Sequence, residues 1–166
     1  MKHEDASALQ TDLREPLQRE TVASIGFRDL VALEIEGASL ADAIRLMQER
    51  AVGCLVVLDR GRLAGIFTER DLLARVLGKA RSFDQPLADY VTRNPTTARV
   101  DEPIHLVLTR MHQGKMRHLP VVDAAGRPVG TMSVKRAAHF LADHYPEAVF
   151  NVPPDPDRFP ESREGG

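Results

Sequence analysis

Two stretches of the chain repeat the same spacing of apolar and polar residues. Residues 39–47 and residues 103–111 each carry apolar side chains at positions i, i+3, i+4 and i+7. This spacing places the apolar side chains on one face of an α-helix. The stretches are offset by 64 residues and predict two amphipathic helices. Their apolar positions are Leu40, Ala43, Ile44 and Met47 in the first and Ile104, Val107, Leu108 and Met111 in the second.

Short runs of aliphatic and β-branched residues follow each predicted helix. Residues 55–59 match residues 119–123 at the same offset, and a polar turn separates each run from another, at 63–67 and at 128–132. Such runs, bounded by turn residues, predict buried strands. Each predicted helix is therefore followed by a pair of strands that forms a hairpin.

The pattern extends on both sides of these elements. A strand is expected before each helix, at 31–35 and at 96–100, and a second helix begins at Thr68 and at Ser133. The unit is strand, helix, strand, strand, helix, used twice. The sequence therefore predicts an α+β protein in which two β-α-β-β-α repeats pack as a pseudo-two-fold pair.

The repeats divide the chain into five segments. A short helix is expected at 87–91, ended by Asn94 and Pro95, because the residue before a proline disfavours helix. Prolines alternate with charged residues near the C-terminus, which predicts a segment without a core of its own. The predicted segments are an N-terminal arm at 1–24, repeat 1 at 25–80, a linker at 81–94, repeat 2 at 95–147 and a proline-rich tail at 148–166.

Composition narrows the possible functions. Hydrophobic residues make up 43% of the 166 residues but aromatic residues only 5%, so the core must be mainly aliphatic. The formal net charge of −2 does not favour nucleic acid or an acidic membrane as a partner. No apolar run is long enough to span a bilayer, and no signal peptide is recognised, so a cytoplasmic location is expected. The single cysteine, Cys54, excludes an intrachain disulfide and is interpreted as a small buried side chain.

The junction between a strand and a helix at residues 65–71 carries the most informative chemistry. The first turn of a helix has unpaired N–H groups and a positive dipole end, which suit a phosphate. Thr68 could donate its hydroxyl to a phosphate oxygen, and Asp71 could accept hydrogen bonds from a ribose diol. Gly65 has no Cβ, so a flat base could approach the backbone there. The alternative is that Thr68 and Asp71 form a capping box, which stabilises a helix without any ligand.

The second junction differs from the first at the deciding carboxylate. Ser133 replaces Thr68, but Arg136 stands where the first copy has Asp71. Cations in the first turn of a helix are unfavourable with its dipole, by about 0.3–1 kcal/mol each. They are either solvated surface residues or groups that face a bound polyanion. The two potential sites are therefore expected to differ.

These junctions, together with the segment at 117–123, resemble tandem CBS domains, the arrangement called a Bateman module. The resemblance covers residues 25–145 and implies that an adenosine compound binds in the cleft between the repeats: AMP, ADP, ATP, S-adenosylmethionine or NAD. It implies that Thr68 meets phosphate, Asp71 meets ribose, and Ile66 with the strand at Thr96 and Thr97 holds the base. The candidate ligand-binding residues are Gly65, Ile66, Thr68, Arg70, Asp71, Thr96, Thr97, Arg117, His118, Pro120, Ser133 and Arg136.

The sequence therefore favours a regulatory module that binds an adenosine-type nucleotide and signals to another protein. No catalytic residues and no metal site are predicted, because neither an activated nucleophile nor a cluster of metal ligands is recognised. No cofactor is required; the adenine nucleotide is a regulatory ligand. The expected partners are a second copy of the chain, as CBS pairs commonly form homodimers, and a regulated protein. The alternative function is an interaction scaffold whose ligand sites are vestigial.

Overall fold

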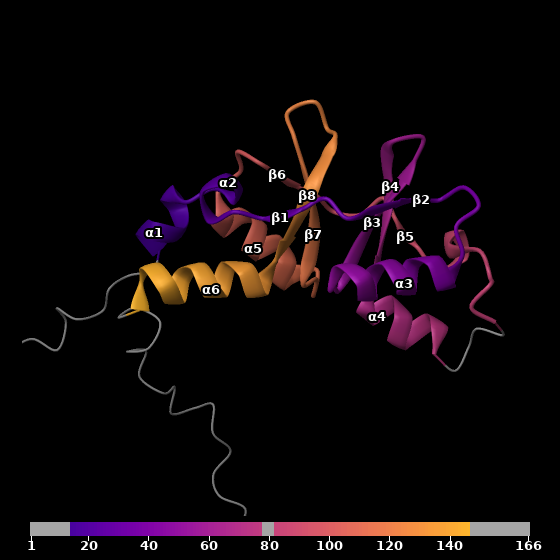
Figure 1. Cartoon of the computed structure of the whole chain (residues 1–166). Helices are drawn as coiled ribbons and strands as arrows, with labels where there is room; N and C mark the ends of the chain where they lie inside the picture. Colours follow the sequence, from indigo (N-terminus) through magenta and orange to yellow (C-terminus); the bar gives the residue numbers. More distant parts are fainter. Residues whose placement is uncertain (1–13, 78–81, 147–166) are drawn as a thin grey trace, which may run out of the picture.

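Two four-stranded sheets stand next to each other, and the longer helices run along one side of them (Figure 1). The computed structural model describes residues 14–77 and 82–146. Residues 1–13 of the predicted arm and the predicted tail at 148–166 lie outside the described residues. The strand orders are β2-β3-β4-β5 and β1-β8-β7-β6. The predicted α+β architecture with two repeats is confirmed.

The first unit folds in the predicted order of strand, helix, strand, strand, helix. Its long helix begins at a Ser39 cap and ends at Ala51, whose φ of 48° is left-handed. Because this helix forms a crossover connection, the strands on either side of it run parallel, whereas the next two strands form an antiparallel hairpin. The elements are β2 (Ala32–Glu34), α3 (Leu40–Arg50), β3 (Cys54–Asp59), β4 (Arg62–Thr68) and α4 (Glu69–Asp71), continued by η2 (Leu72–Val76).

The second unit repeats this order. Its long helix begins after Pro103, which suits a helix start, and ends at Gly114. The strands joined by the crossover are again parallel, and the hairpin is again antiparallel. The elements are β6 (Ala98–Arg99), α5 (Ile104–Gln113), β7 (His118–Val122), β8 (Pro128–Ser133) and α6 (Val134–His144).

Two elements depart from the sequence prediction. The strand expected at 96–100 is shorter, and Thr96 and Thr97 lie in the loop before β6. The helix expected after Thr68 widens into a π-helical turn, in which the Leu77 N–H donates to the Leu72 carbonyl (2.9 Å). The matching helix of the second unit, α6, is a regular helix of 11 residues. The helix of the first unit is therefore locally modified and that of the second is not. Such π-helical turns occur frequently at functional sites.

The segments that precede each unit cross to the other unit. α2 (Val22–Ile25) and β1 (Arg28–Asp29) pack with the second unit, where β1 pairs with β8. In the same way, η3 (Leu87–Asp89) and β5 (Thr92–Arg93) pack with the first unit, where β5 pairs with β4. The segment predicted as a linker therefore completes the first sheet. The short helix α1 (Arg14–Arg19) precedes α2.

Each unit has its own aliphatic core, and the crossing segments contribute to both. Val22 and Ile25 from α2 are buried against α5, β7 and β8 in the second core. Leu87 and Val91 are buried in the first core with the apolar face of α3. Among the described buried residues Phe67 is the one aromatic side chain. The aliphatic core predicted from composition is therefore confirmed, and the two units cannot separate without exposing core residues.

Candidate functional site

A cavity of about 290 Å³ lies between the two units, at the ends of the strands that lead into the helices. The start of α4, the loop before β6 and the segment before β7 all contribute side chains to it. Its lining residues are Gly53, Ile66, Thr68, Glu69, Arg70, Asp71, Thr92, Asn94, Pro95, Thr96, Met116, Arg117 and His118. We call this space the first cleft. Seven of the twelve candidate residues named above line it: Ile66, Thr68, Arg70, Asp71, Thr96, Arg117 and His118.

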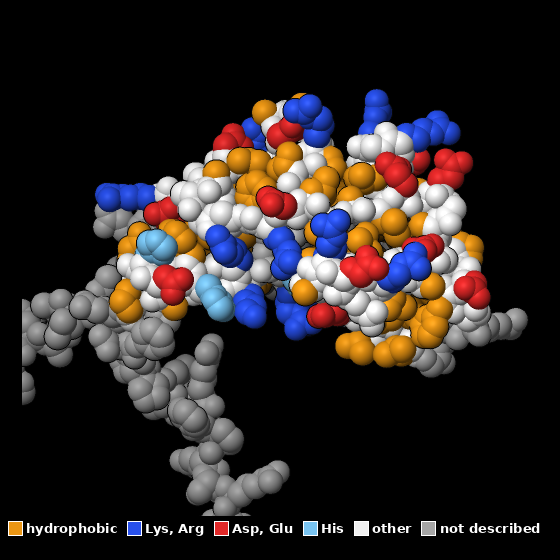
Figure 2. Space-filling view, viewed as in Figure 1, with side chains coloured by type: hydrophobic (Ala, Val, Ile, Leu, Met, Phe, Trp, Pro, Cys, Tyr) orange, Lys and Arg blue, Asp and Glu red, His pale blue; other side chains and the backbone are white. Residues whose placement is uncertain are grey.

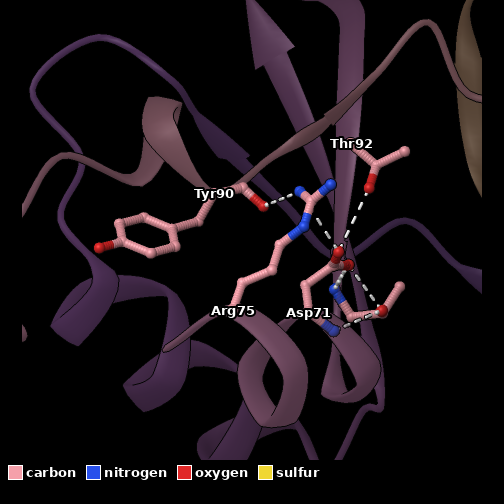
Figure 3. Close-up of polar contacts among 5 residues, drawn as sticks. Asp71, Arg75, Tyr90 and Thr92 are labelled. Atoms are coloured by element: carbon pink, nitrogen blue, oxygen red, sulfur yellow. Dashed lines mark hydrogen bonds and ion pairs between the residues drawn. The ribbon is translucent and has the colours of Figure 1, made fainter. Parts of the chain in front are cut away.

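Asp71 lies at the centre of the polar contacts in the first cleft (Figure 3). One carboxylate oxygen, Oδ2, accepts hydrogen bonds from the Thr68 N–H (3.0 Å) and from the Thr68 hydroxyl (2.7 Å). The other oxygen, Oδ1, accepts a long bond from the Thr92 hydroxyl (3.3 Å) and lies 3.6 Å from the Arg75 guanidinium. Arg75 is held in turn by the Tyr90 carbonyl (3.0 Å). Asp71 is the one buried charged residue in the described part of the chain, at 9% exposure.

Thr68 and Asp71 form the capping box that was the alternative interpretation of this motif. The same box occurs at the start of α3, where the Ser39 N–H and hydroxyl donate to Asp42 Oδ2 at 3.0 and 2.6 Å. Neither Ser39 nor Asp42 lines the first cleft or the larger cleft described below. The cap therefore explains the spacing of the motif, and what distinguishes Asp71 from Asp42 is its place in a cleft.

The expected phosphate contact by Thr68 differs from what the structure shows. The single hydroxyl proton of Thr68 is donated to Asp71, so it is not available to a phosphate oxygen in this arrangement. Two backbone donors nearby are also engaged, because the Glu69 N–H donates to the Gly53 carbonyl (3.0 Å) and the Asp71 N–H to the Thr68 hydroxyl (3.3 Å). In this arrangement a phosphate therefore cannot use the Thr68 hydroxyl proton or these two N–H groups.

Gly65, Thr97 and Pro120 are not among the residues that line either cleft. Gly65 was expected to let a base approach, but it faces the crossing strand β5. A Cβ at Gly65 would collide with Val91 and would lie 2.6 Å from the Thr92 carbonyl oxygen. The glycine is required for sheet packing, and this reason could not be found without knowing that β5 pairs with β4.

A second, larger cleft of about 860 Å³ lies at the matching position of the second unit. Ser133 and Arg136 line it, as the predicted equivalence of the junctions requires. Half of the helix cap is kept at this junction, since the Ser133 hydroxyl still accepts a hydrogen bond from the Arg136 N–H (3.1 Å). The second cleft is lined by Phe27, Arg28, Ala51, Val52, Gly53, Cys54, Glu69, Arg117, His118, Thr131, Ser133, Val134, Lys135, Arg136 and His139.

Four residues line both clefts and form a shared wall: Gly53, Glu69, Arg117 and His118. Burial lowers the pKa of His118, and the charge of Arg117 lowers it further, while Glu69 acts in the opposite direction. His118 is therefore mostly neutral at pH 7. Of the wall residues, the sequence pointed to Arg117 and His118 but not to Glu69 or Gly53. Glu69 was missed because acidic residues in a first helical turn are common without any ligand.

Cys54 is buried at 3% exposure, as expected for a small packed side chain. Burial, with a smaller contribution from the Asp71 charge, raises the pKa of its thiol to about 12. The thiolate is therefore scarce at neutral pH.

Within the described ranges no group of three or more His, Cys, Asp or Glu side chains is placed to hold a metal ion. Nor does any helix there have the length and apolar character needed to cross a membrane.

A fold of two interleaved β-α-β-β-α units with a cleft at each helix start defines a duplicated ligand-binding module. The family model for the CBS domain matches residues 22–78 and 87–143. The chain therefore belongs to the CBS domain family, with two such domains in tandem. This confirms the resemblance inferred from the sequence.

Known proteins similar to this chain agree with the family. The chain is 33% identical, over 76% of its length, to the CBS domain-containing protein CBSCBSPB1 of Arabidopsis thaliana, and spans 24% of that relative. A CBS domain protein from Pyrobaculum aerophilum, complexed with AMP, is 25% identical with a TM-score of 0.65, covering 70% of this chain and 89% of that one. The CBS domain pair of protein MJ0100, in complex with 5′-methylthioadenosine and S-adenosyl-L-methionine, is 25% identical with a TM-score of 0.66, covering 74% and 99%.

Proposed function

We propose that the chain is a non-catalytic regulatory module that binds an adenosine-type nucleotide in the first cleft. The observation that carries this proposal is the Asp71 carboxylate. Its Oδ2 is saturated by Thr68, whereas its Oδ1 has only a long bond to Thr92 and a distant guanidinium. A carboxylate offers about four acceptor positions. Oδ1 therefore keeps the capacity to accept a hydrogen bond from a ribose hydroxyl.

The rest of the first cleft is consistent with a nucleoside. Ile66 and Met116 supply apolar surface for a base, and the loop at Thr96 supplies a polar edge. A volume of about 290 Å³ lies near the lower end of the roughly 300–1,000 Å³ typical of small-molecule sites. The phosphates would extend towards the shared wall, where Arg117 and His118 are available. The similarity to proteins complexed with AMP and with S-adenosylmethionine supports the ligand class.

The regulatory output would pass to another protein, and the module would act as a homodimer. The helical side of the first unit exposes Leu73 and Leu77, one helical turn apart, at 65% and 50%. Exposed apolar pairs of this kind suit a contact with a second copy. Binding of a nucleotide between the units would change how firmly they are held together, which a partner protein could detect.

The experiment that tests the nucleotide site is calorimetric titration of AMP, ADP, ATP, S-adenosylmethionine and NAD into the wild type and into Asp71→Asn. We expect at least one of these compounds to bind, and Asp71→Asn to weaken its binding tenfold or more, or by about 1.4 kcal/mol. The asparagine retains an acceptor for Thr68, so the helix cap is largely preserved. Thermal unfolding with increasing nucleotide should confirm binding to the native state.

Asp42→Asn is the matched control, because Asp42 occupies a capping box of nearly the same geometry outside both clefts. It should bind nucleotide as the wild type does. Equal losses in the two variants would indicate an effect of the cap on stability and not of the ribose contact. If none of the compounds binds at millimolar concentration, the module is a scaffold with vestigial sites.

A further inference from the structure

The second cleft is lined by cations. Four permanent positive charges face it, from β1, from the segment before β7 and from the first turn of α6, while a single carboxylate, Glu69, lies on the shared wall. Figure 2 shows lysine and arginine side chains gathered where the two units meet. The chain as a whole has a net charge of −2, so this concentration is local. The four cations are Arg28, Arg117, Lys135 and Arg136.

The strand register shows that two of these cations replace uncharged or acidic groups of the first cleft. Thr92 lies opposite Ile66 in the first sheet, and at the matching place Arg28 lies opposite Thr131 in the second. Arg136 occupies the position of Asp71, three residues after the helix cap. The positions of the Thr92 hydroxyl and the Asp71 carboxylate in the first cleft are thus occupied by two arginines in the second cleft. At these two positions no side chain can accept a hydrogen bond from a ribose diol, whereas two guanidinium groups can donate to an anion.

The backbone holds these two arginines in place without using up their donors. One nitrogen of Arg28 donates to the Arg50 carbonyl at the end of α3 (2.8 Å), and Arg136 Nε donates to the Ile25 carbonyl (3.4 Å). A guanidinium has five N–H donors, so most of them remain available. None of the four cations forms an ion pair with any other described residue.

Two neighbouring cations, Lys135 and Arg136, also lie in the first turn of α6, where the helix dipole opposes positive charge. Like charges gathered in a cleft that holds a single carboxylate repel one another and are stabilised by a bound anion. Guanidinium groups bind phosphate through paired N–H donors, and the lysine adds a point charge. The size of the cleft, about 860 Å³, accommodates more than one phosphoryl group.

We propose that the second cleft is a polyphosphate site that needs no ribose contact and that is separate from the nucleotide site at Asp71. The phosphoryl groups could come from inorganic polyphosphate or from the phosphate chain of a nucleotide. In either case the recognised chemistry is a chain of at least two phosphoryl groups. This ligand lies beside Arg117 and His118, on the wall that also lines the first cleft.

The test is calorimetric titration of inorganic tripolyphosphate into the full-length wild type and into three full-length variants. Lys135→Gln combined with Arg136→Gln should weaken binding at least tenfold. Arg60→Gln combined with Arg62→Gln is the control, because it removes the same charge from two exposed residues, one in the β3–β4 turn and one at the start of β4. It should change the affinity less than threefold. Asp71→Asn should also change it less than threefold. Circular dichroism and thermal unfolding check that every variant is folded.

Three results would overturn the proposal. The wild type could fail to bind tripolyphosphate at 1 mM. The control pair could lose as much affinity as the cleft pair, which would mean general charge attraction. Asp71→Asn could abolish binding, which would place the phosphates in the first cleft. Adenosine and ATP are titrated in parallel, in order to separate the two sources of phosphoryl groups. If ATP displaces tripolyphosphate from the Asp71→Asn variant and adenosine does not, the result supports a phosphate-only site that a nucleotide can share.

Discussion

The two clefts of this module share one backbone design but differ in charge. Each lies where a hairpin leads into a helix, and at each the helix start is capped by a hydroxyl side chain, Thr68 in the first and Ser133 in the second. Three residues further on, the first cleft has Asp71 and the second has Arg136. The first is mixed in charge, whereas the second is dominated by cations.

This difference separates what maintains the fold from what selects a ligand. The cap survives in both units because the hydroxyl alone satisfies the N–H group three residues later. The reciprocal carboxylate is present only in the first unit, where it also faces a cleft. The helix start is capped without the carboxylate, so this position can carry a different charge in each unit. Under the proposed function, the choice of ligand depends on a few side chains placed on a common frame.

The first prediction tests whether the two units depend equally on their crossing strands. Gly65→Ala should lower the free energy of unfolding by about 1–3 kcal/mol, because a Cβ there collides with Val91 and crowds the Thr92 carbonyl. Gly130→Ala should have a similar effect, since its Cβ would lie 2.5 Å from the Phe27 ring and would collide with the backbone of β1. Chemical denaturation measures both.

Gly53→Ala is the control for these two variants. Its Cβ would meet only the end of the flexible Glu69 side chain, at 3.0 Å, so the loss should stay within about 0.5 kcal/mol. If Gly65→Ala and Gly130→Ala are as stable as this control, the crossing strands do not constrain the units as the structure implies.

The second prediction converts the junction of the second unit into that of the first. Arg136→Asp should raise the free energy of unfolding by about 0.5–1 kcal/mol, because it completes the capping box with Ser133 and removes a cation from the first turn of α6. Arg136→Ala removes the cation without adding a carboxylate and should be intermediate. Thermal unfolding measures the order. A loss of stability in both variants would mean that the bond from Arg136 to the Ile25 carbonyl outweighs the cap.

The third prediction concerns His118, which lies opposite Ser133 just as Cys54 lies opposite Thr68. Burial and Arg117 lower its pKa in the folded state below the unfolded value of about 6.5. The unfolded chain therefore binds the proton more tightly, and stability is lost as pH falls below about 6.5. The effect should be under about 1 kcal/mol because the side chain is partly exposed to water.

Denaturation curves of the wild type and of His118→Gln, measured between pH 8 and pH 5, test this contribution. The difference in stability between them should shift in favour of the variant as the pH falls. A constant difference over this range would show that the environment of His118 does not disfavour its charged form.

The sequence predicted the repeated architecture well because the signal was local. Apolar spacing identified α3 and α5, and the runs at 55–59 and 119–123 identified β3 and β7. Seven of the twelve candidate residues line the first cleft, and Ser133 and Arg136 line the second, because residues at equivalent junctions occupy equivalent places. The candidates Gly65, Thr97 and Pro120 lie outside both, since their neighbours are set by strand pairing.

The sequence by itself determined the elements, their order, their duplication and the exchange of a carboxylate for a guanidinium between the copies. These are properties of local spacing and side-chain identity. Only the tertiary structure decided that α2 and β1 pack with the second unit and β5 with the first, because such pairing joins segments distant in the chain. It also decided that Arg28 and Arg136 line the same cleft, and that Glu69 belongs to the wall that both clefts share.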